Sequence, residues 1–337
     1  MQQTGDGGGH GRDAKVPADV PAAGWRDILV RTVKESKADG APLLAAGVAF
    51  YALLALAPAL TALAGLYGLV ADPADAARQV RDLLAAAPTE VRDLVEVQLT
   101  TAAERSQGGA LAFMVIGALL ALWSASSGVQ HLIGAINTAY DEEETRGFVK
   151  VRGLALLLTA GAIVFLAVSI GVIALLPAVL ADTALGDASR ITIAILRWPA
   201  LGLSMIGGLA VIYRVAPDRE DPRWSWAGLG SVVATLLWLI GSVAFSVYSA
   251  SFGKYETTYG ALGAVVVVML WLFLTAYVVV LGAELNAEAE RQTRKDTTTG
   301  HGRSLGERGA EAADTVGPTA HEVKAGVKAS ADVSGSR

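Results

Sequence analysis

Six long apolar segments, separated by short polar loops, constrain this chain more than any other feature. They lie at about residues 41–70, 110–139, 154–181, 191–215, 227–250 and 260–284. Each is long enough to cross the hydrocarbon core of a bilayer, which takes about 20 helical residues. Because lipid cannot satisfy backbone polar groups, such a segment is expected to be a helix. The sequence therefore predicts an all-α polytopic membrane protein with six transmembrane helices.

Composition agrees with one membrane domain and excludes several other classes. The chain is 53% hydrophobic and only 18% charged, whereas soluble domains carry about 25% charged residues. A net charge of −5 argues against general affinity for nucleic acid. The absence of cysteine excludes disulfides and thiolate metal sites. We expect no cofactor and no metal.

Basic residues predict the orientation of the helices. Twenty of the 27 Lys and Arg residues lie in the N-terminal segment, the loops after the second and fourth apolar segments, and the C-terminal tail. Such residues favour the cytoplasmic side. With six spans both termini fall on that side, so we expect a multi-pass protein of the plasma membrane, the bacterial inner membrane, with both termini cytoplasmic. Residues 72–109 then form an extracytoplasmic segment, which we expect to hold two short helices.

The sequence suggests three regions. Residues 1–22 and 291–337 are polar and predicted to be disordered, and residues 23–290 form the membrane domain. Residues 25–37 are amphipathic, which fits either a helix in the membrane interface or an extension of the first span. Asp39 is expected to cap the first spanning helix, and Pro58 to kink it.

Polar residues in the second apolar segment form the candidate pathway. Ser124, Ser127 and His131 recur at three and four residues and share one helical face, with Gln130 and Asn137 on the adjoining face. Polar residues inside a span face other helices or a wet cavity. Two alternatives stay open: a substrate or ion path, and interhelical hydrogen bonding. Glu284, at the end of the sixth segment, is expected to pair with a basic residue such as Arg152 or Arg214.

Several stretches resemble the YihY/BrkB family of six-span membrane proteins. They are DGAPLLAAGVAFYALLALAP at 39–58, WSASSGVQHLIGAINTAY at 123–140, YRVAP at 213–217, YGALG at 259–263 and GAELN at 282–286. Residues 55–57 depart from the pattern, because the family often has a serine and a bulkier residue before the proline. The residues that the resemblance marks are Asp39, Phe50, Tyr51, Pro58, Trp123, Arg152, Tyr213, Pro217, Tyr259, Gly260, Trp271, Gly282, Glu284 and Asn286.

The resemblance implies an inner-membrane protein that supports envelope integrity. Our first hypothesis is a transporter or lipid-translocase-like protein, with the bilayer as its environment and a lipid-type or small molecule as substrate. The alternative is a non-transporting scaffold that binds an envelope partner or further copies of itself. Some family members carry the label ribonuclease BN. The chain has four histidines, three of them in the predicted tails, and no cluster that could build a hydrolytic metal site. We therefore expect no enzyme activity.

Overall fold

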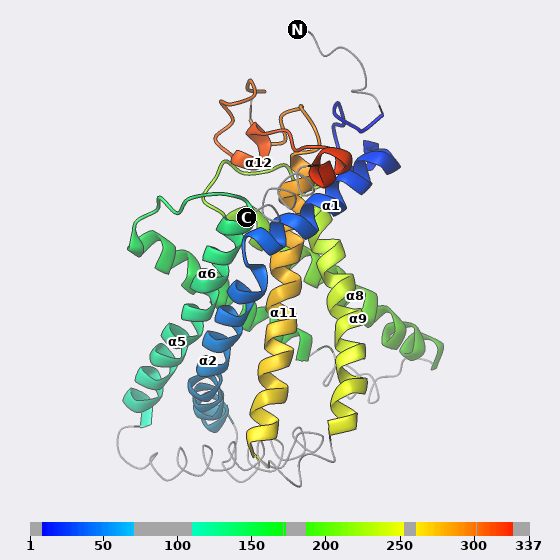
Figure 1. Ribbon diagram of the computed structural model, residues 1–337. Coiled ribbons are helices and arrows are strands. Elements are labelled where there is room, and N and C mark those ends of the chain that lie inside the picture. The colour runs from blue at the N-terminus through cyan, green and yellow to red at the C-terminus, as the bar shows by residue number, and fades with distance from the viewer. Residues whose placement is uncertain are drawn as a thin grey trace, which may run out of the picture.

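The computed structural model describes residues 9–70, 110–170, 172, 187–252, 261–300 and 302–325. Regular structure in these residues is helical, apart from an isolated β-bridge between Pro222 and Thr298. The six long helices are α2 (Ala41–Val70), α5 (Ala110–Ala139), α6 (Phe148–Ile170), α8 (Asp187–Val215), α9 (Trp224–Phe252) and α11 (Ala261–Glu290). Each overlaps one of the predicted apolar segments, although α6 begins six residues before the predicted start at 154, and together they form a bundle (Figure 1).

Four of these helices satisfy the length and composition of a membrane span within the described residues. Their spanning parts are Phe148–Leu166, Ile191–Val215, Trp224–Tyr248 and Val265–Glu290. A fifth arises if α1 (Ala22–Ala38) and the first half of α2 count as one bent span. The chain is thus a helical membrane protein whose described residues hold four to five such spans, and six spans with cytoplasmic termini stay a prediction. The predicted extracytoplasmic helices at 72–109 lie outside the described residues.

The joint between α1 and α2 is a sharp bend. The axes of Ala22–Ala38 and Ala41–Ala55 differ by 63°, so α1 is not a straight extension of α2 but lies across the end of the bundle (Figure 1). Asp39, expected to cap the start of α2, is instead the C-terminal cap of α1. Gly40 makes the turn with a φ of +64°, a conformation that glycine adopts without strain. Pro58 lies within α2, but its side chain is outside the described set, so the kink stays a prediction.

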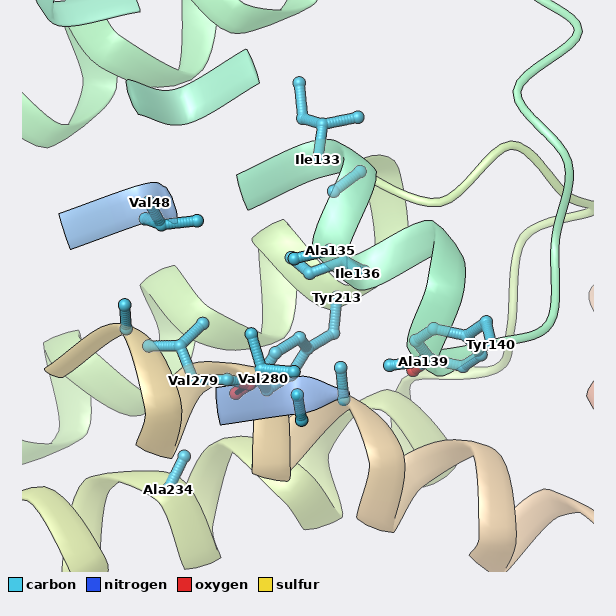
Figure 2. Packing of buried hydrophobic residues seen from close by; sticks show 14 of the residues in the cluster. Val48, Ile133, Ala135, Ile136, Ala139, Tyr140, Tyr213, Ala234, Val279 and Val280 are labelled. Atoms are coloured by element: carbon cyan, nitrogen blue, oxygen red, sulfur yellow. Dashed lines mark hydrogen bonds between the residues drawn. The ribbon is translucent and has the colours of Figure 1, made fainter. Parts of the chain in front are cut away.

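The core consists of small and branched apolar residues where α2, α5, α8 and α11 converge. Val48, Ile136, Tyr213 and Val280 are buried together there (Figure 2). Helices α9 and α11 approach closely at Gly282. A side chain on this residue would collide with the hydroxyl of Tyr213 and with the Cβ of Ala234. Small residues permit this backbone contact, and it holds α11 in the middle of the bundle.

The described parts of both tails are packed at the same end of the bundle as α1 (Figure 1). The N–H of Arg294 donates to the carbonyl of Arg12 at 2.7 Å, and the hydroxyl of Thr293 donates to the carbonyl of Ala14 at 2.7 Å. The guanidinium of Arg308 is buried and donates to four backbone carbonyls. The N-terminal part includes the short helix η1 (Pro17–Asp19), and the C-terminal part includes α12 (Glu311–Asp314).

This packing differs from the disorder predicted for residues 1–22 and 291–337. Residues 9–22, 291–300 and 302–325 have defined positions and hydrogen bonds. Their polar groups form hydrogen bonds with residues that are distant in the sequence. A local sequence pattern does not reveal such partners.

Candidate functional site

The guanidinium of Arg152, near the start of α6, organises the polar residues of α5. Its Nη1 donates to the hydroxyl of Ser127 at 3.2 Å and to Oε1 of Gln130 at 3.0 Å. Its Nη2 donates to the carbonyl of Trp123 at 2.6 Å. The guanidinium carbon lies 3.7 Å from the centre of the Trp123 ring, a cation–π contact. We call Arg152, Trp123, Ser127 and Gln130 the Arg152 site.

Arg152 carries a buried charge without a balancing carboxylate. Its residue is only 6% exposed, and its Nε is buried without a hydrogen-bond partner. All three acceptors around it are neutral oxygens, and no ion pair found in the described residues includes it. Burying a lone cation in a membrane span is costly, which makes such a residue a candidate functional group. The Trp123 ring beside it is 52% exposed on the outside of the bundle, so the site adjoins the outer surface.

The predicted polar stripe on α5 divides between two neighbours. Ser127 and Gln130 turn to Arg152, as described above, whereas the exposed His131 ring stacks on Tyr51 of α2, with 3.9 Å between centroids. Phe50 contacts the edge of Tyr51 at 5.5 Å. Ser124 is half-buried on the same helix and does not join the contacts of Arg152.

Asn137 lies almost two helical turns beyond His131 and belongs to a different cluster. Its Nδ2 donates to Glu144 at 2.9 Å, and its Oδ1 accepts from the N–H of Asp218 at 2.8 Å. Arg146 also pairs with Glu144, at 2.6 Å. Asn137 therefore ties together the two loops that follow α5 and α8, and the structure does not bring it to the Arg152 site.

Other residues marked by the family resemblance pack the middle and the end of α11. The hydroxyl of Tyr213 donates to the carbonyl of Val279 at 2.8 Å (Figure 2). Asn286 joins α11 to α9: its Oδ1 accepts from the N–H of Gly230 at 2.6 Å, and its Nδ2 donates to the carbonyl of Ala227 at 3.1 Å. These residues hold helices together.

The family resemblance marks four further positions. Pro217 is buried just after α8. Trp271 meets Trp238 of α9 edge to face, with 6.2 Å between centroids. Tyr259 and Gly260 lie outside the described residues.

The pairing predicted for Glu284 is wrong. Arg152 bonds to α5, and Arg214 pairs instead with Asp221 at 3.1 Å. Glu284 is 1% exposed, and its Oε1 has no hydrogen-bond partner. Helix ends that carry opposite charge in the sequence thus do not face each other in the bundle.

Sequence reasoning missed a set of buried ion pairs at the end of the bundle covered by the tails. Arg31 of α1 pairs with Glu288 of α11, and Arg219 pairs with Glu290 at 2.8 Å with both side chains fully buried. A less buried pair lies beside them: Arg291 binds the exposed Asp141 at 2.9 Å. The spacing of Glu284, Glu288 and Arg291 on one helical face is the signal that could have indicated a polar end of α11.

Metal chemistry has no visible support in the part of the chain that the structure describes. No group of three or more His, Cys, Asp or Glu side chains lies there in an arrangement that could hold a metal ion. The chemistry that the geometry does offer is recognition of charge, by the lone buried guanidinium at the Arg152 site and by the buried carboxyl group of Glu284.

Comparison with known proteins identifies relatives of this chain. The family profile described as virulence factor BrkB matches residues 32–304. A UPF0761 membrane protein of Cronobacter sakazakii is 28% identical over 276 residues, which is 79% of this chain and 88% of the relative. YfkH of Bacillus subtilis, whose name calls it ribonuclease-like, is 33% identical over 209 residues, covering 60% of this chain and 73% of YfkH. No solved structure matches the chain.

Proposed function

The chain belongs to the BrkB family of membrane proteins, and on that premise we propose that it is a lipid-translocase-like transporter of the plasma membrane. In this proposal the Arg152 site binds the anionic headgroup of a lipid-type substrate. Both chain ends lie in the cytoplasm, as the distribution of basic residues suggests.

The observation that carries the proposal is the uncompensated guanidinium of Arg152. A structural arginine in a span is normally paired with a carboxylate or reaches the interface with its charged end. Arg152 does neither, because its partners are neutral oxygens and its residue is 6% exposed. An anionic oxygen would supply the missing charge, and guanidinium groups bind phosphate well because their N–H donors form a planar fork.

The surroundings of the site suit a lipid rather than a water-soluble anion. Trp123 is exposed beside Arg152, and large apolar residues such as Leu119 and Leu120 are exposed on the same helix. In a membrane these side chains face acyl chains. A headgroup at Arg152 would therefore leave its chains in lipid, the arrangement that a translocase requires.

The test is translocation of fluorescent phospholipids in vesicles that contain the purified full-length protein. A membrane-impermeant quencher reports the fraction of labelled lipid that reaches the outer leaflet. We expect faster translocation than in empty vesicles, with an anionic headgroup preferred over a zwitterionic one. Arg152→Gln removes charge-assisted hydrogen bonds that each contribute about 1.5–3 kcal/mol, so the rate should fall about tenfold or more.

Arg214→Gln is the matched control. Arg214 also lies beside a tryptophan, 4.6 Å from the ring centre of Trp224, but it has a carboxylate partner in Asp221. Its loss should leave lipid translocation unchanged. Translocation that is equal in protein-containing and empty vesicles would refute the transporter and favour the scaffold. The ribonuclease-like name of YfkH is tested on the same preparation by metal-dependent RNA cleavage, where we expect none.

A further inference from the structure

His131 is a polar side chain on the outside of the bundle that is not bonded to Arg152. It follows Gln130 on α5, and its exposed ring is stacked on Tyr51 of α2, with 3.9 Å between centroids and 16° between the ring planes. Within the described residues no hydrogen bond or ion pair includes the imidazole. A polar group without a partner inside a membrane span is costly, which makes His131 a candidate for contact with a ligand.

The helical position of His131 places it next to a partner of Arg152. Residues four apart lie on adjacent turns of one helical face, with about 5–6 Å between their Cβ atoms. His131 is therefore the next position along α5 from Ser127, whose hydroxyl accepts from Arg152 at 3.2 Å. Helix α5 packs against both α2 and α6 (Figure 1). The imidazole, on the α2 side, and the guanidinium, from α6, thus border one strip of α5, where Trp123 is also exposed.

The side chains along this strip offer hydrogen-bond donors. Arg152 can only donate, and its Nε has no partner. The side-chain oxygens of Ser127 and Gln130 already accept from it. An imidazole carries an N–H donor in both its neutral and its charged form. Such a set suits a headgroup that is rich in acceptor oxygens and carries no cation.

Phosphate headgroups differ in how many oxygens they leave free. In a phosphodiester lipid two phosphate oxygens are esterified, and a single negative charge remains. In a phosphate monoester the outer oxygen is free, and the group carries about −1.5 to −2 charges at pH 7. That additional oxygen can accept from a second donor while the other oxygens accept from a guanidinium.

We propose that His131 is a specificity-determining residue of the Arg152 site, and that the substrate is a lipid with a terminal phosphate monoester. Arg152 binds the phosphate. His131, held by its stack on Tyr51, donates to the outer oxygen that an alcohol blocks in a phosphodiester. The inference rests on the proposed function, which puts a headgroup at Arg152, and it names the chemistry of that headgroup.

Isothermal titration calorimetry of the full-length protein in detergent micelles measures headgroup binding without translocation. The probes are short-chain phosphatidic acid, a phosphate monoester, and phosphatidylglycerol with the same chains, a phosphodiester. We expect phosphatidic acid to bind about tenfold more tightly, because it accepts one more charge-assisted hydrogen bond. Glycerol 3-phosphate, the same headgroup without chains, should bind more weakly. If it bound as tightly as phosphatidic acid, the ligand would be a soluble anion and the lipid assignment would be wrong.

His131→Phe keeps a ring that can stack on Tyr51 but removes the N–H donors. This variant should bind phosphatidic acid about tenfold more weakly and phosphatidylglycerol as the native protein does, which also shows that it is folded. His321→Phe is the matched control: His321 is exposed in the C-terminal tail, and its loss should leave both affinities unchanged. Arg152→Gln should weaken the binding of both lipids.

Three binding results would overturn the role of His131: equal affinity of the native protein for the two lipids, a preference for phosphatidic acid that survives in His131→Phe, and equal loss of both affinities in that variant. The vesicle assay separates this inference from the proposed function. Phosphatidic acid that binds as expected but is not translocated by the native protein would refute transport and leave the headgroup site standing. Translocation that depends on Arg152 but does not favour phosphatidic acid over phosphatidylglycerol would refute only the monoester specificity.

Discussion

Replacing Arg219 by Met should destabilise the protein far more than replacing any exposed arginine at the same end of the bundle. The Arg219 and Glu290 side chains are both 0% exposed, and the guanidinium makes two bonds to the carboxylate, at 3.2 and 2.8 Å. Burial tends to lower the pKa of Arg219, but the contact with Glu290 outweighs it and the pKa is raised. Arg219 therefore keeps its charge in the buried pair.

The cost follows from the charge that stays behind. Without Arg219, the carboxylate of Glu290 keeps one side-chain partner among the described residues, the hydroxyl of Thr297 at 2.6 Å. Leaving one partner of a buried pair uncompensated costs about 3–5 kcal/mol. The exposed pair Arg303–Glu220 has side chains 47% and 46% exposed, and such pairs contribute about 0–1 kcal/mol. Arg303→Met is thus the matched control.

The assay is equilibrium unfolding in mixed detergent micelles, followed by tryptophan fluorescence. We expect the free energy of unfolding to fall by about 3–5 kcal/mol in Arg219→Met and by less than about 1 kcal/mol in Arg303→Met. The double variant that replaces Arg219 and Glu290 by Met should recover most of the loss, because no buried charge remains. Equal effects of the two single variants would refute the reasoning from burial.

Three further predictions concern the joint, the helix contact and the topology. The pKa of Asp39 is raised from 3.8, so the folded state holds this proton more tightly than the unfolded state does. The free energy of unfolding should therefore fall as pH rises above about 4. Asp39→Asn should flatten this pH dependence when unfolding is measured across pH. Gly282→Val should abolish folded protein on size-exclusion chromatography, since its side chain collides with the hydroxyl of Tyr213, whereas a stable variant would show that α9 and α11 can separate. This chain has no cysteine, so single cysteines can report the topology. Gln98→Cys should react with an impermeant maleimide in intact cells, and Glu143→Cys only after lysis. The reverse pattern would show that the predicted orientation is wrong.

Much of the helical architecture could be predicted from the sequence, because it depends on local properties. In lipid, a run of more than 20 apolar residues can satisfy its backbone N–H and C=O groups within the segment only as a helix. Each of the six runs does contain a helix. Helical spacing placed Ser127 and Gln130 on adjoining faces of the second apolar segment, and in the structure both accept a hydrogen bond from Arg152. The resemblance on residues 39–58 and 123–140 also led to the correct family.

Which charges meet was decided by the tertiary structure alone. Glu284 was expected to pair with Arg152 or Arg214, yet Arg152 bonds to α5, Arg214 pairs with Asp221, and Oε1 of the buried Glu284 has no hydrogen-bond partner. The C-terminal tail was expected to be disordered, yet its described part is packed. Arg31, for example, bonds to both Gln292 and the carbonyl of Pro318. Helical period depends on neighbouring residues, whereas the balance of buried charge depends on distant ones. Arg31 and Glu288 are 257 positions apart and Arg219 and Glu290 are 71 apart, and only the packed bundle brings each pair together.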